Sequence, residues 1–379
     1  MALQPRPPRF VRLVFASAGL VLLVAAGAVM ATFLRAERAA PERAATSGPT
    51  LVFAEFGLNA DEILVAPAED PEARTPIQTI PHASGWGLNP APALVAGRTA
   101  YTVLPPNATP SRTSAAELWL LEVDTTSASR LARDADLLAA PVLRQDGAVL
   151  AYRRTEDGGG QSLLRVDLQT RARRVLHTDH SSFGLFPVGF DEGGALLFTR
   201  LSADGTDLMR VSEGAAPELI IHASDEIARD WSVAPAGDAV AFVAPLLQAE
   251  RIVHQAQVVS LRTDAVVATT PAASFLGEQY GPTWRGDGAL ALGREAIDGG
   301  GVAPVVVGTA EGPILPAASA GFDVPLGWSV GGDYLAVRHF SGSGSQNPGT
   351  ETLVLIGTDS SRQTIATDTE LIFLGWTGA

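Results

Sequence analysis

The sequence predicts an all-β fold, a seven-bladed β-propeller preceded by one N-terminal transmembrane helix. Three observations carry this prediction. Apolar residues alternate with a period of two from residue 51 onward, a turn that ends in glycine recurs along the chain, and an uncharged run lies near the N-terminus. Many short strands are typical of sandwiches, barrels and propellers, and the length of the repeat distinguishes among these folds.

The predicted strands are short and rich in Val, Leu and aromatic residues. Their apolar and polar positions alternate, and Gly, Pro, Asp or Asn residues bound them, as expected for β-strands. Clear examples are Leu51–Phe56, Leu118–Val123, Leu163–Leu168 and Gln257–Leu261. No segment after the N-terminal run has a convincing helical periodicity, so we expect strands throughout the rest of the chain.

The recurring turn defines a repeat. Glycine adopts positive φ without a steric penalty, which suits it to a tight turn between two strands. Seven copies align on their glycines, which are Gly97, Gly147, Gly194, Gly237, Gly288, Gly332 and Gly378. Successive glycines lie 50, 47, 43, 51, 44 and 46 residues apart. This spacing is the length of a four-stranded propeller blade.

The seventh copy indicates how the ring closes. Leu371–Ala379 contains a first strand and its turn, and it stops before a second strand. The three missing strands are found at Leu51–Phe56, Glu62–Ala66 and Arg74–Ile80. We therefore predict that these N-terminal strands complete the last blade, with Leu371–Trp376 paired to the first of them. Such closure leaves no free sheet edge.

Two copies of the turn, Ala234–Phe242 and Trp328–Val337, also carry a family resemblance. They resemble the WD40-like β-propeller repeat of TolB-type proteins, whose consensus is aromatic-Ser-Pro-Asp-Gly-x-x-Ile/Leu-Ala-Phe. The resemblance covers roughly residues 51–379 and implies a propeller. The same repeat caps prolyl oligopeptidase-type peptidases. An anchor and a tether stand here in place of the α/β domain of TolB, so the resemblance implies no particular partner.

The sixth copy contains a Gly-x-Ser-x-Gly sequence at 327–331, which matches the nucleophile elbow of hydrolases. That motif requires a helix after the serine, whereas a turn and a strand follow here. We therefore interpret Ser329 as a structural residue of the turn. The neighbouring Trp328 is expected to pack between blades, as are Trp284 and Trp376 of other copies.

The N-terminal segment differs in composition from the rest. We expect a short cytoplasmic tail at residues 1–12, a transmembrane signal-anchor helix at 13–34, a flexible tether at 35–50 and the propeller domain at 51–379. The 22-residue run is long enough to span the hydrocarbon core of a bilayer. A signal peptide cleaved after Ala31 is the alternative. Three arginines flank the run on each side, so the positive-inside rule does not decide its orientation.

The charge balance excludes some classes of ligand. Residues 44–379 contain 21 basic and 39 acidic residues, a formal net charge of −18. Nucleic-acid binding requires a basic surface, and anionic lipid head groups attract basic segments, so neither is expected as a ligand. The chain has no cysteine, which excludes disulfides and cysteine metal ligands. We predict no cofactor.

One cluster has the residue types of a metal site. His177, Asp179 and His180 are close in sequence, and two histidines with a carboxylate can bind zinc or iron. His82, His177 and His222 also recur about one repeat apart, near the end of a blade's fourth strand. We favour the interpretation that these histidines form hydrogen bonds at strand ends. The alternative is a metal-dependent hydrolase or lyase, or a lactonase-like propeller enzyme.

Loop lengths favour one face of the propeller as the binding face. The loops between second and third strands and the loops between blades project from the same face, and Pro245–Gln255 is one of several long examples. Binding residues commonly lie on long loops of a rigid scaffold. The candidates are Trp86, His180, Phe183, Phe186, Glu278, Gln279, Tyr280 and Phe322. Alternatively, the aromatic candidates fill the central channel and pack between blades.

The sequence therefore predicts a non-catalytic binding module. We expect a single-pass membrane protein whose propeller domain is extracytoplasmic, in the periplasm or at the cell surface. Its expected partner is an envelope protein, a peptide or an envelope polymer, and its N-terminal helix contacts the membrane. The enzyme described above is the alternative function, and a structural or sensory ectodomain is a third hypothesis.

Overall fold

The computed structural model describes residues 48–111, 114–180, 183–248, 251–269, 278–295, 301–307, 315–359, 361–365 and 370–378. The expected tail, signal-anchor helix and most of the tether lie outside these residues. Every secondary-structure element of the described part is a β-strand. No helix in this part is long and apolar enough to cross a membrane.

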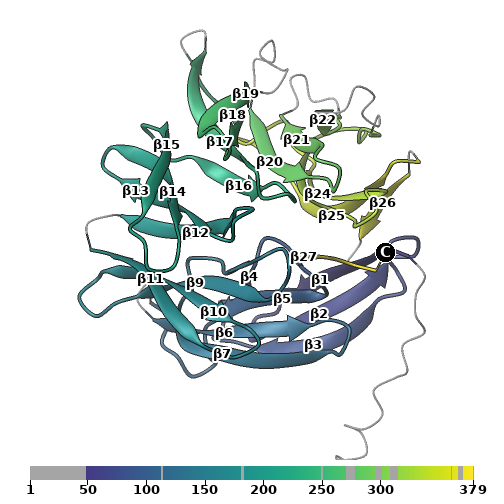
Figure 1. Cartoon of the computed structure of the whole chain (residues 1–379). Coiled ribbons are helices and arrows are strands. Elements are labelled where there is room, and N and C mark those ends of the chain that lie inside the picture. Colours follow the sequence, from purple (N-terminus) through teal and green to yellow (C-terminus); the bar gives the residue numbers. More distant parts are fainter. Residues whose placement is uncertain are drawn as a thin grey trace, which may run out of the picture. The chain divides into compact units, whose positions relative to one another are not determined.

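The strands form seven antiparallel sheets, which are the seven blades (Figure 1). Blade A contains β27 (Leu371–Thr377), β1 (Thr50–Glu55), β2 (Ala60–Pro67) and β3 (Thr75–Pro81). Blade B contains β4 (Asn89–Pro90), β5 (Arg98–Val103), β6 (Ala115–Glu122) and β7 (Ser127–Asp136). Blade C contains β8 (Val142–Leu143), β9 (Val149–Thr155), β10 (Gln161–Asp167) and β11 (Arg173–Asp179).

The remaining blades follow in chain order. Blade D contains β12 (Gly184–Phe190), β13 (Leu196–Ser202), β14 (Gly205–Val211) and β15 (Glu218–Ser224). Blade E contains β16 (Arg229–Val233), β17 (Ala239–Gln248), β18 (Arg251–Ser260) and β19 (Ala265–Thr269). The described strands of blade F are β20 (Gln279–Trp284), β21 (Leu290–Arg294) and β22 (Val305–Val307). Blade G contains β23 (Phe322–Trp328), β24 (Tyr334–Phe340), β25 (Glu351–Gly357) and β26 (Arg362–Ile365).

The first strands of successive blades contact one another. β8 contacts β12, β12 contacts β16, and the contacts continue through β20 and β23 to β27. Gly375 of β27 lies against Leu94, which follows β4, and β5 contacts β8. The order of contacts therefore runs through all seven blades. Antiparallel sheets arranged in this way form a β-propeller, so the predicted all-β, seven-bladed fold is confirmed.

The recurring turn has the expected backbone geometry. All seven aligned glycines have positive φ, from 66° at Gly147 to 85° at Gly288. In the sixth copy, Ser329 is buried and its hydroxyl accepts a hydrogen bond of 3.0 Å from the backbone N–H of Tyr334. Ser329 therefore stabilises the turn, as the sequence predicts.

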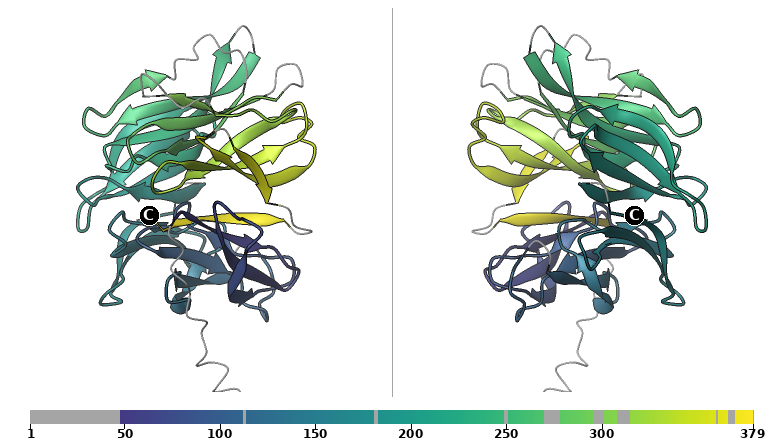
Figure 2. Two further views of the ribbon diagram at one scale, coloured as in Figure 1. Left: turned by 90° about the vertical axis from the view of Figure 1, so that its right-hand side faces the viewer. Right: turned by 90° about the vertical axis from the view of Figure 1, so that its left-hand side faces the viewer.

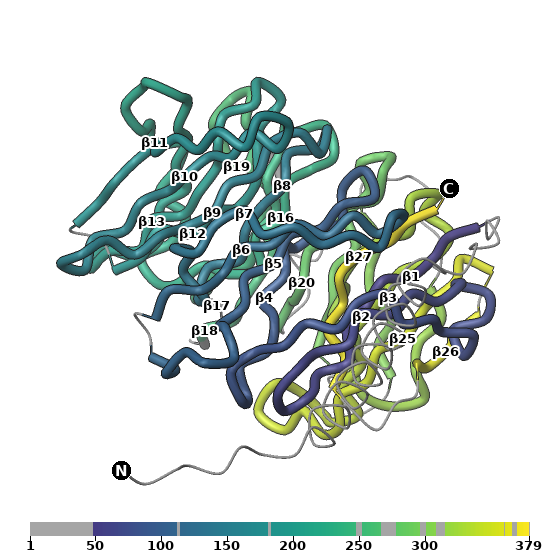
Figure 3. Tube along the Cα trace, turned by 90° about the horizontal axis from the view of Figure 1, so that it is seen from below, coloured from purple at the N-terminus to yellow at the C-terminus, as the bar shows by residue number. Residues whose placement is uncertain are grey.

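The last strand of the chain pairs with the first. β27 lies antiparallel to β1, with Thr377 opposite Thr50 and Leu371 opposite Glu55. Figures 2 and 3 show the yellow β27 beside the purple β1. The residues from Leu51 to Ala54 have no exposed surface, because β2 and β27 flank the strand and side chains of blades B and G pack on its two faces. This is the pairing that the sequence predicts for the last strand.

Tryptophans at the ends of first strands join neighbouring blades. The indole N–H of Trp376 donates a 3.0 Å hydrogen bond to the carbonyl of Gly327 in blade G. Trp284 makes the corresponding 3.0 Å bond to a carbonyl of blade E. Trp328 is buried, and the guanidinium of Arg285 in blade F lies 5.3 Å from its ring centroid. The predicted packing of these tryptophans between blades is confirmed.

One predicted loop is wrong. Most of Pro245–Gln255 is strand, since β17 continues to Gln248 and β18 begins at Arg251. Proline lacks a backbone N–H and commonly marks the end of a strand. Here Pro245 lies opposite His254 within a continuous ladder, which runs on to the pair of Gln248 and Arg251. The hairpin therefore extends beyond the end that Pro245 indicates.

Candidate binding face

The blades present two faces, which differ in their connections. The turn face carries the turns between first and second strands and between third and fourth strands. The long-loop face carries the loops between second and third strands and the connections between blades. Thr50 at the start of β1 lies opposite Thr377 at the end of β27, so both ends of the described domain lie on the turn face.

The structure divides the predicted binding residues into exposed and buried groups. Phe183 is 71% exposed, and His180 is exposed beside Gly160. Gln279, Tyr280 and Phe322 are buried at the starts of β20 and β23. The candidates therefore do not form a single cluster.

The buried aromatic candidates form a stack between blades F and G. The ring centroid of Phe322 lies 5.6 Å from that of Tyr280 and 5.2 Å from that of Phe340. The hydroxyl of Tyr280 donates a 2.9 Å hydrogen bond to Glu295. Burial raises the pKa of Tyr280, with the Glu295 carboxylate contributing, so the hydroxyl stays a donor at neutral pH. Here the aromatic residues pack between blades.

Phe186 takes part in a second contact between blades. The guanidinium of Arg153 lies 4.4 Å from the centroid of its ring. Arg153 is only 2% exposed, and its Nε donates a 3.1 Å hydrogen bond to Asp136 of blade B. It also donates a 3.0 Å bond to the carbonyl of Leu185 in blade D. Three blades therefore meet at one buried arginine.

Trp86 is partly buried in the connection from blade A to blade B.

The polar candidates Glu278 and Gln279 join blades E and F. Glu278 accepts hydrogen bonds from the backbone N–H of His254 at 3.0 Å and from its Nδ1 at 2.9 Å. The side-chain oxygen of Gln279 accepts a 2.8 Å bond from the N–H of Ala256. Both side chains hold the long hairpin of blade E against the next blade.

Histidines at strand ends form hydrogen bonds with carboxylates. The Nε2 atom of His82, which is buried just after β3, lies 3.0 Å from Asp61. The two ring nitrogens of His222 lie 2.8 Å from Asp207 and 3.0 Å from Asp225. The predicted hydrogen bonding at strand ends is therefore found for these two histidines. Bonds to the Asp207 and Asp225 carboxylates raise the pKa of His222.

The cluster predicted as a possible metal site has a different environment. The ring of His177 packs against Phe198, with centroids 5.8 Å apart, and burial lowers its pKa. Asp179 is the last residue of β11. His180 follows it, and its ring lies against Gly160 of the β9–β10 loop. Among the described residues, no group of three or more His, Asp or Glu side chains is arranged to hold a metal ion.

The long-loop face carries exposed apolar side chains, of which the sequence predicts only Phe183 as a binding residue. Of the ten large apolar side chains that are exposed in the described part of the chain, six lie there. Their exposed fractions range from 53% to 77%. We call this set the loop crown, and its members are Leu58, Leu138, Phe183, Ile227, Leu247 and Ile252. Leu247 and Ile252 lie opposite each other in the hairpin of blade E, and the other four come from separate loops of the same face.

The crown is flanked by acidic loops. The β9–β10, β13–β14 and β15–β16 loops carry exposed Asp157, Asp204, Asp225 and Glu226, and no basic residue lies in these loops. The residues predicted from the long loops are aromatic or polar, and they include no leucine or isoleucine. The available signal was an apolar residue beside turn formers, as in Gly57-Leu-Asn and Asp225-Glu-Ile.

Comparisons with known proteins bear on the fold. A scan of protein families finds no match to this chain, and a search of curated proteins finds none either. Many solved structures are similar. TolB from Acinetobacter baumannii has 12% identity and a TM-score of 0.49, and the match covers 88% of this chain and 67% of TolB.

Two further structures have somewhat higher TM-scores. The β-propeller domain of the Trilobed protease from Pyrococcus furiosus has 10% identity and a TM-score of 0.52, covering 86% of this chain and 98% of that domain. An oligogalacturonate lyase in complex with manganese has 13% identity and a TM-score of 0.50, covering 81% of this chain and 85% of the lyase. At these identities the similarity concerns the fold alone. The chain is thus similar in architecture to propellers of diverse activity.

Proposed function

We propose that this chain is a membrane-anchored, extracytoplasmic β-propeller that binds a protein, a peptide or an envelope polymer through its long-loop face, without catalysis. The observation that carries the proposal is the loop crown. Six exposed apolar side chains lie on the face opposite the one that holds both ends of the described domain. Exposed apolar groups with a polar rim are typical of binding surfaces.

The flanking charges support a partner with basic groups. Asp225 and Glu226 share the β15–β16 loop with Ile227, and Asp204 lies in the β13–β14 loop. The backbone N–H of Phe183 donates a 2.8 Å hydrogen bond to the carbonyl of Leu201, near the end of β13 that leads into this loop. Complementary charges speed association and favour the correct partner. A ligand that combines apolar and basic groups therefore suits the face better than an acidic one.

The position of Thr50, the first residue of β1, supports the anchored arrangement. The tether joins β1, which begins on the turn face. The membrane helix itself is inferred from the apolar run at residues 13–34. An anchor attached through the turn face leaves the long-loop face available to a partner.

The binding proposal is tested by expressing full-length variants with single substitutions in cells and crosslinking them to their partners. Phe183→Ser and Ile252→Ser each remove an apolar side chain from the crown, and Val330→Ser removes one of similar exposure from the turn face. We expect both crown variants to lose crosslinked partners that the Val330→Ser variant retains. If all three variants retain the same partners, the long-loop face is not the binding face.

The localisation is tested by cysteine labelling, because the chain has no cysteine of its own. The carboxylate of Asp225 is 97% exposed, so Asp225→Cys provides an accessible thiol. We expect a maleimide that cannot cross the inner membrane to label this variant in cells with a permeabilised outer layer. Labelling only after lysis would place the propeller in the cytoplasm.

A further inference from the structure

A groove on the rim of the propeller is lined mainly by basic residues, whereas the domain as a whole is acidic. It has a volume of about 420 Å³ and lies along the outer strand of blade B, next to that of blade C. Its lining residues are Arg130, Leu131, Ala132, Arg133, Asp134 and Arg173. Three arginines and one aspartate line it, whereas residues 44–379 carry a net charge of −18.

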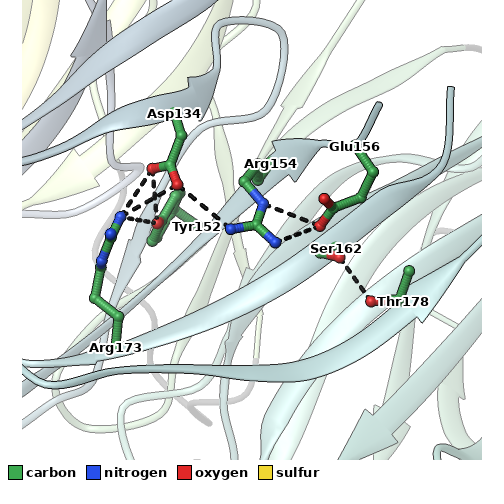
Figure 4. A network of polar contacts seen from close by, with 7 residues as sticks. All are labelled: Asp134, Tyr152, Arg154, Glu156, Ser162, Arg173 and Thr178. Carbon is green, nitrogen blue, oxygen red and sulfur yellow. Dashed lines mark hydrogen bonds and ion pairs between the residues drawn. The ribbon is translucent and has the colours of Figure 1, made fainter. Parts of the chain in front are cut away.

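The aspartate in the groove is already neutralised. Asp134 accepts hydrogen bonds from the Tyr152 hydroxyl at 3.1 Å, from Arg173 at 3.0 Å and from Arg154 at 3.4 Å (Figure 4). Burial and the Asp134 charge raise the pKa of Tyr152 to about 12, so the phenol remains a donor. A carboxylate engaged by two guanidiniums and a hydroxyl offers little repulsion to an incoming anion.

The arginines of the groove retain donor capacity. Arg133 is exposed and has no side-chain partner among the described residues. Arg173 is 43% exposed, and the contacts of its guanidinium run through one nitrogen, to Asp134 and Tyr152. Arg130 pairs with Glu117 but remains partly exposed. Each guanidinium carries five N–H donors, so further bonds to oxygen ligands are available.

The backbone explains why consecutive side chains face one groove. Side chains of a regular strand alternate between the two faces of a sheet. The pairing of β6 with β7 shifts register twice, between Ala116 and Leu118 and between Leu118 and Trp119. Bulges of this kind redirect side chains and are frequent near functional sites. As a result, five successive residues of β7 line the groove.

We propose that this groove binds an acidic, extended peptide segment of a partner protein. Arg130 and Arg133 are three residues apart, roughly 10 Å along a strand, which matches separate carboxylates along a peptide better than one compact anion. Leu131, which is partly exposed between them, provides apolar contact, whereas Ala132 is buried beneath it in the core. The groove shares no residue with the loop crown.

The test uses the full-length chain in detergent and a fluorescent hexaglutamate peptide at low ionic strength. We expect wild-type protein to bind the peptide, Arg133→Ala to weaken binding roughly tenfold, and Arg133→Glu to abolish it. Arg262→Ala, which removes a 66% exposed arginine from the turn face, is the control and should leave binding unchanged. Because the Arg133 side chain has no partner in the described structure, both of its variants should unfold at the wild-type temperature.

Three results would overturn the proposal. One is the absence of hexaglutamate binding by the wild-type protein. Another is an equal loss of binding in Arg133→Ala and Arg262→Ala, which would indicate non-specific charge attraction. The third is binding of inorganic polyphosphate, but not of hexaglutamate, in an Arg133-dependent manner, which would assign the groove to phosphates. Crown variants such as Phe183→Ser should not affect this measurement, so the two binding proposals fail independently.

Discussion

The turn face and the long-loop face belong to the same blades but are stabilised by different contacts. On the turn face, the same glycine turn occurs seven times, and ion pairs such as Arg144–Asp146 join residues two positions apart. On both faces polar contacts also join different blades. Those of the turn face repeat in kind, as in the bonds from Trp284 to Ser232 and from Trp376 to Gly327, whereas those of the long-loop face differ from blade to blade. Asp61 of blade A, for example, accepts a 2.7 Å hydrogen bond from the N–H of Leu88 near the start of blade B.

This difference shows where the blades are alike and where they diverge. The turn face repeats the same glycine turn in every blade and the same tryptophan-to-carbonyl bond at two junctions between blades. The long-loop face is stabilised by Asp61 and His82 in one place and by Asp136 and Arg153 in another. Contacts that differ from blade to blade allow the loops above them to differ too. A propeller of this kind can vary its binding surface without changing its turns.

The largest expected effect tests the buried contacts of the long-loop face. Arg153→Met leaves the Asp136 carboxylate buried without its ion pair, and we expect a loss of about 3–5 kcal/mol in the free energy of unfolding. Arg144→Met breaks an exposed local pair on the turn face and should cost at most about 1 kcal/mol. Denaturant unfolding measures both variants. Equal losses would contradict the distinction between the two faces.

The second prediction concerns strain within the turn face. Gly237 has a φ of 72°, and a Cβ there would lie 2.6 Å from the backbone nitrogen of Glu192. Gly237→Ala should therefore cost about 2–3 kcal/mol. Gly288 occupies the same place in another copy, but no atom lies within 4 Å of its Cβ position. Gly288→Ala should cost only about 1 kcal/mol, as measured by thermal unfolding.

The third prediction concerns the contacts between first strands. Trp376→Phe removes the hydrogen bond to Gly327, whereas the indole nitrogen of Trp328 has no partner among the described residues. Both substitutions reduce the buried area similarly. Trp376→Phe should therefore be more destabilising than Trp328→Phe by about 1 kcal/mol. The reverse order in urea unfolding would show that this bond does not stabilise the junction of blades A and G.

The smallest effect is a pH dependence that separates two histidines. The pKa of His222 is raised by Asp207 and Asp225, so its contribution to stability is present below pH 6.5 and is lost as pH rises through the folded pKa. The pKa of His177 is lowered by burial, so its contribution is present above pH 6.5 and is lost as pH falls. NMR titration should place the two pKa values on opposite sides of 6.5. Spectra of His222→Gln and His177→Gln variants provide the assignments.

The sequence predicts the repeated features well and the unique ones poorly. Gly147 and Gly332 are recognisable because one physical requirement, a positive φ, recurs at a fixed interval. The ion pair of Arg153 and Asp136 cannot be recognised in the sequence, because it depends on how blades B and C pack. The exposed Leu138 and Leu247 carry the same letter as core leucines, so only the structure distinguishes them. Six of the eight predicted binding residues are partly or fully buried by packing that composition does not reveal. His180 and Phe183 are exposed, and Phe183 alone joins the crown.

The pairing of β27 with β1 also has a consequence for the order of folding. β1 leaves the ribosome early, whereas its partner β27 begins more than 300 residues further along the chain. Until β27 has been synthesised, this edge of β1 stays open, and open edges promote aggregation. The nascent chain therefore exposes a strand edge throughout the synthesis of the intervening blades, and truncation before Leu371 should leave that edge unpaired.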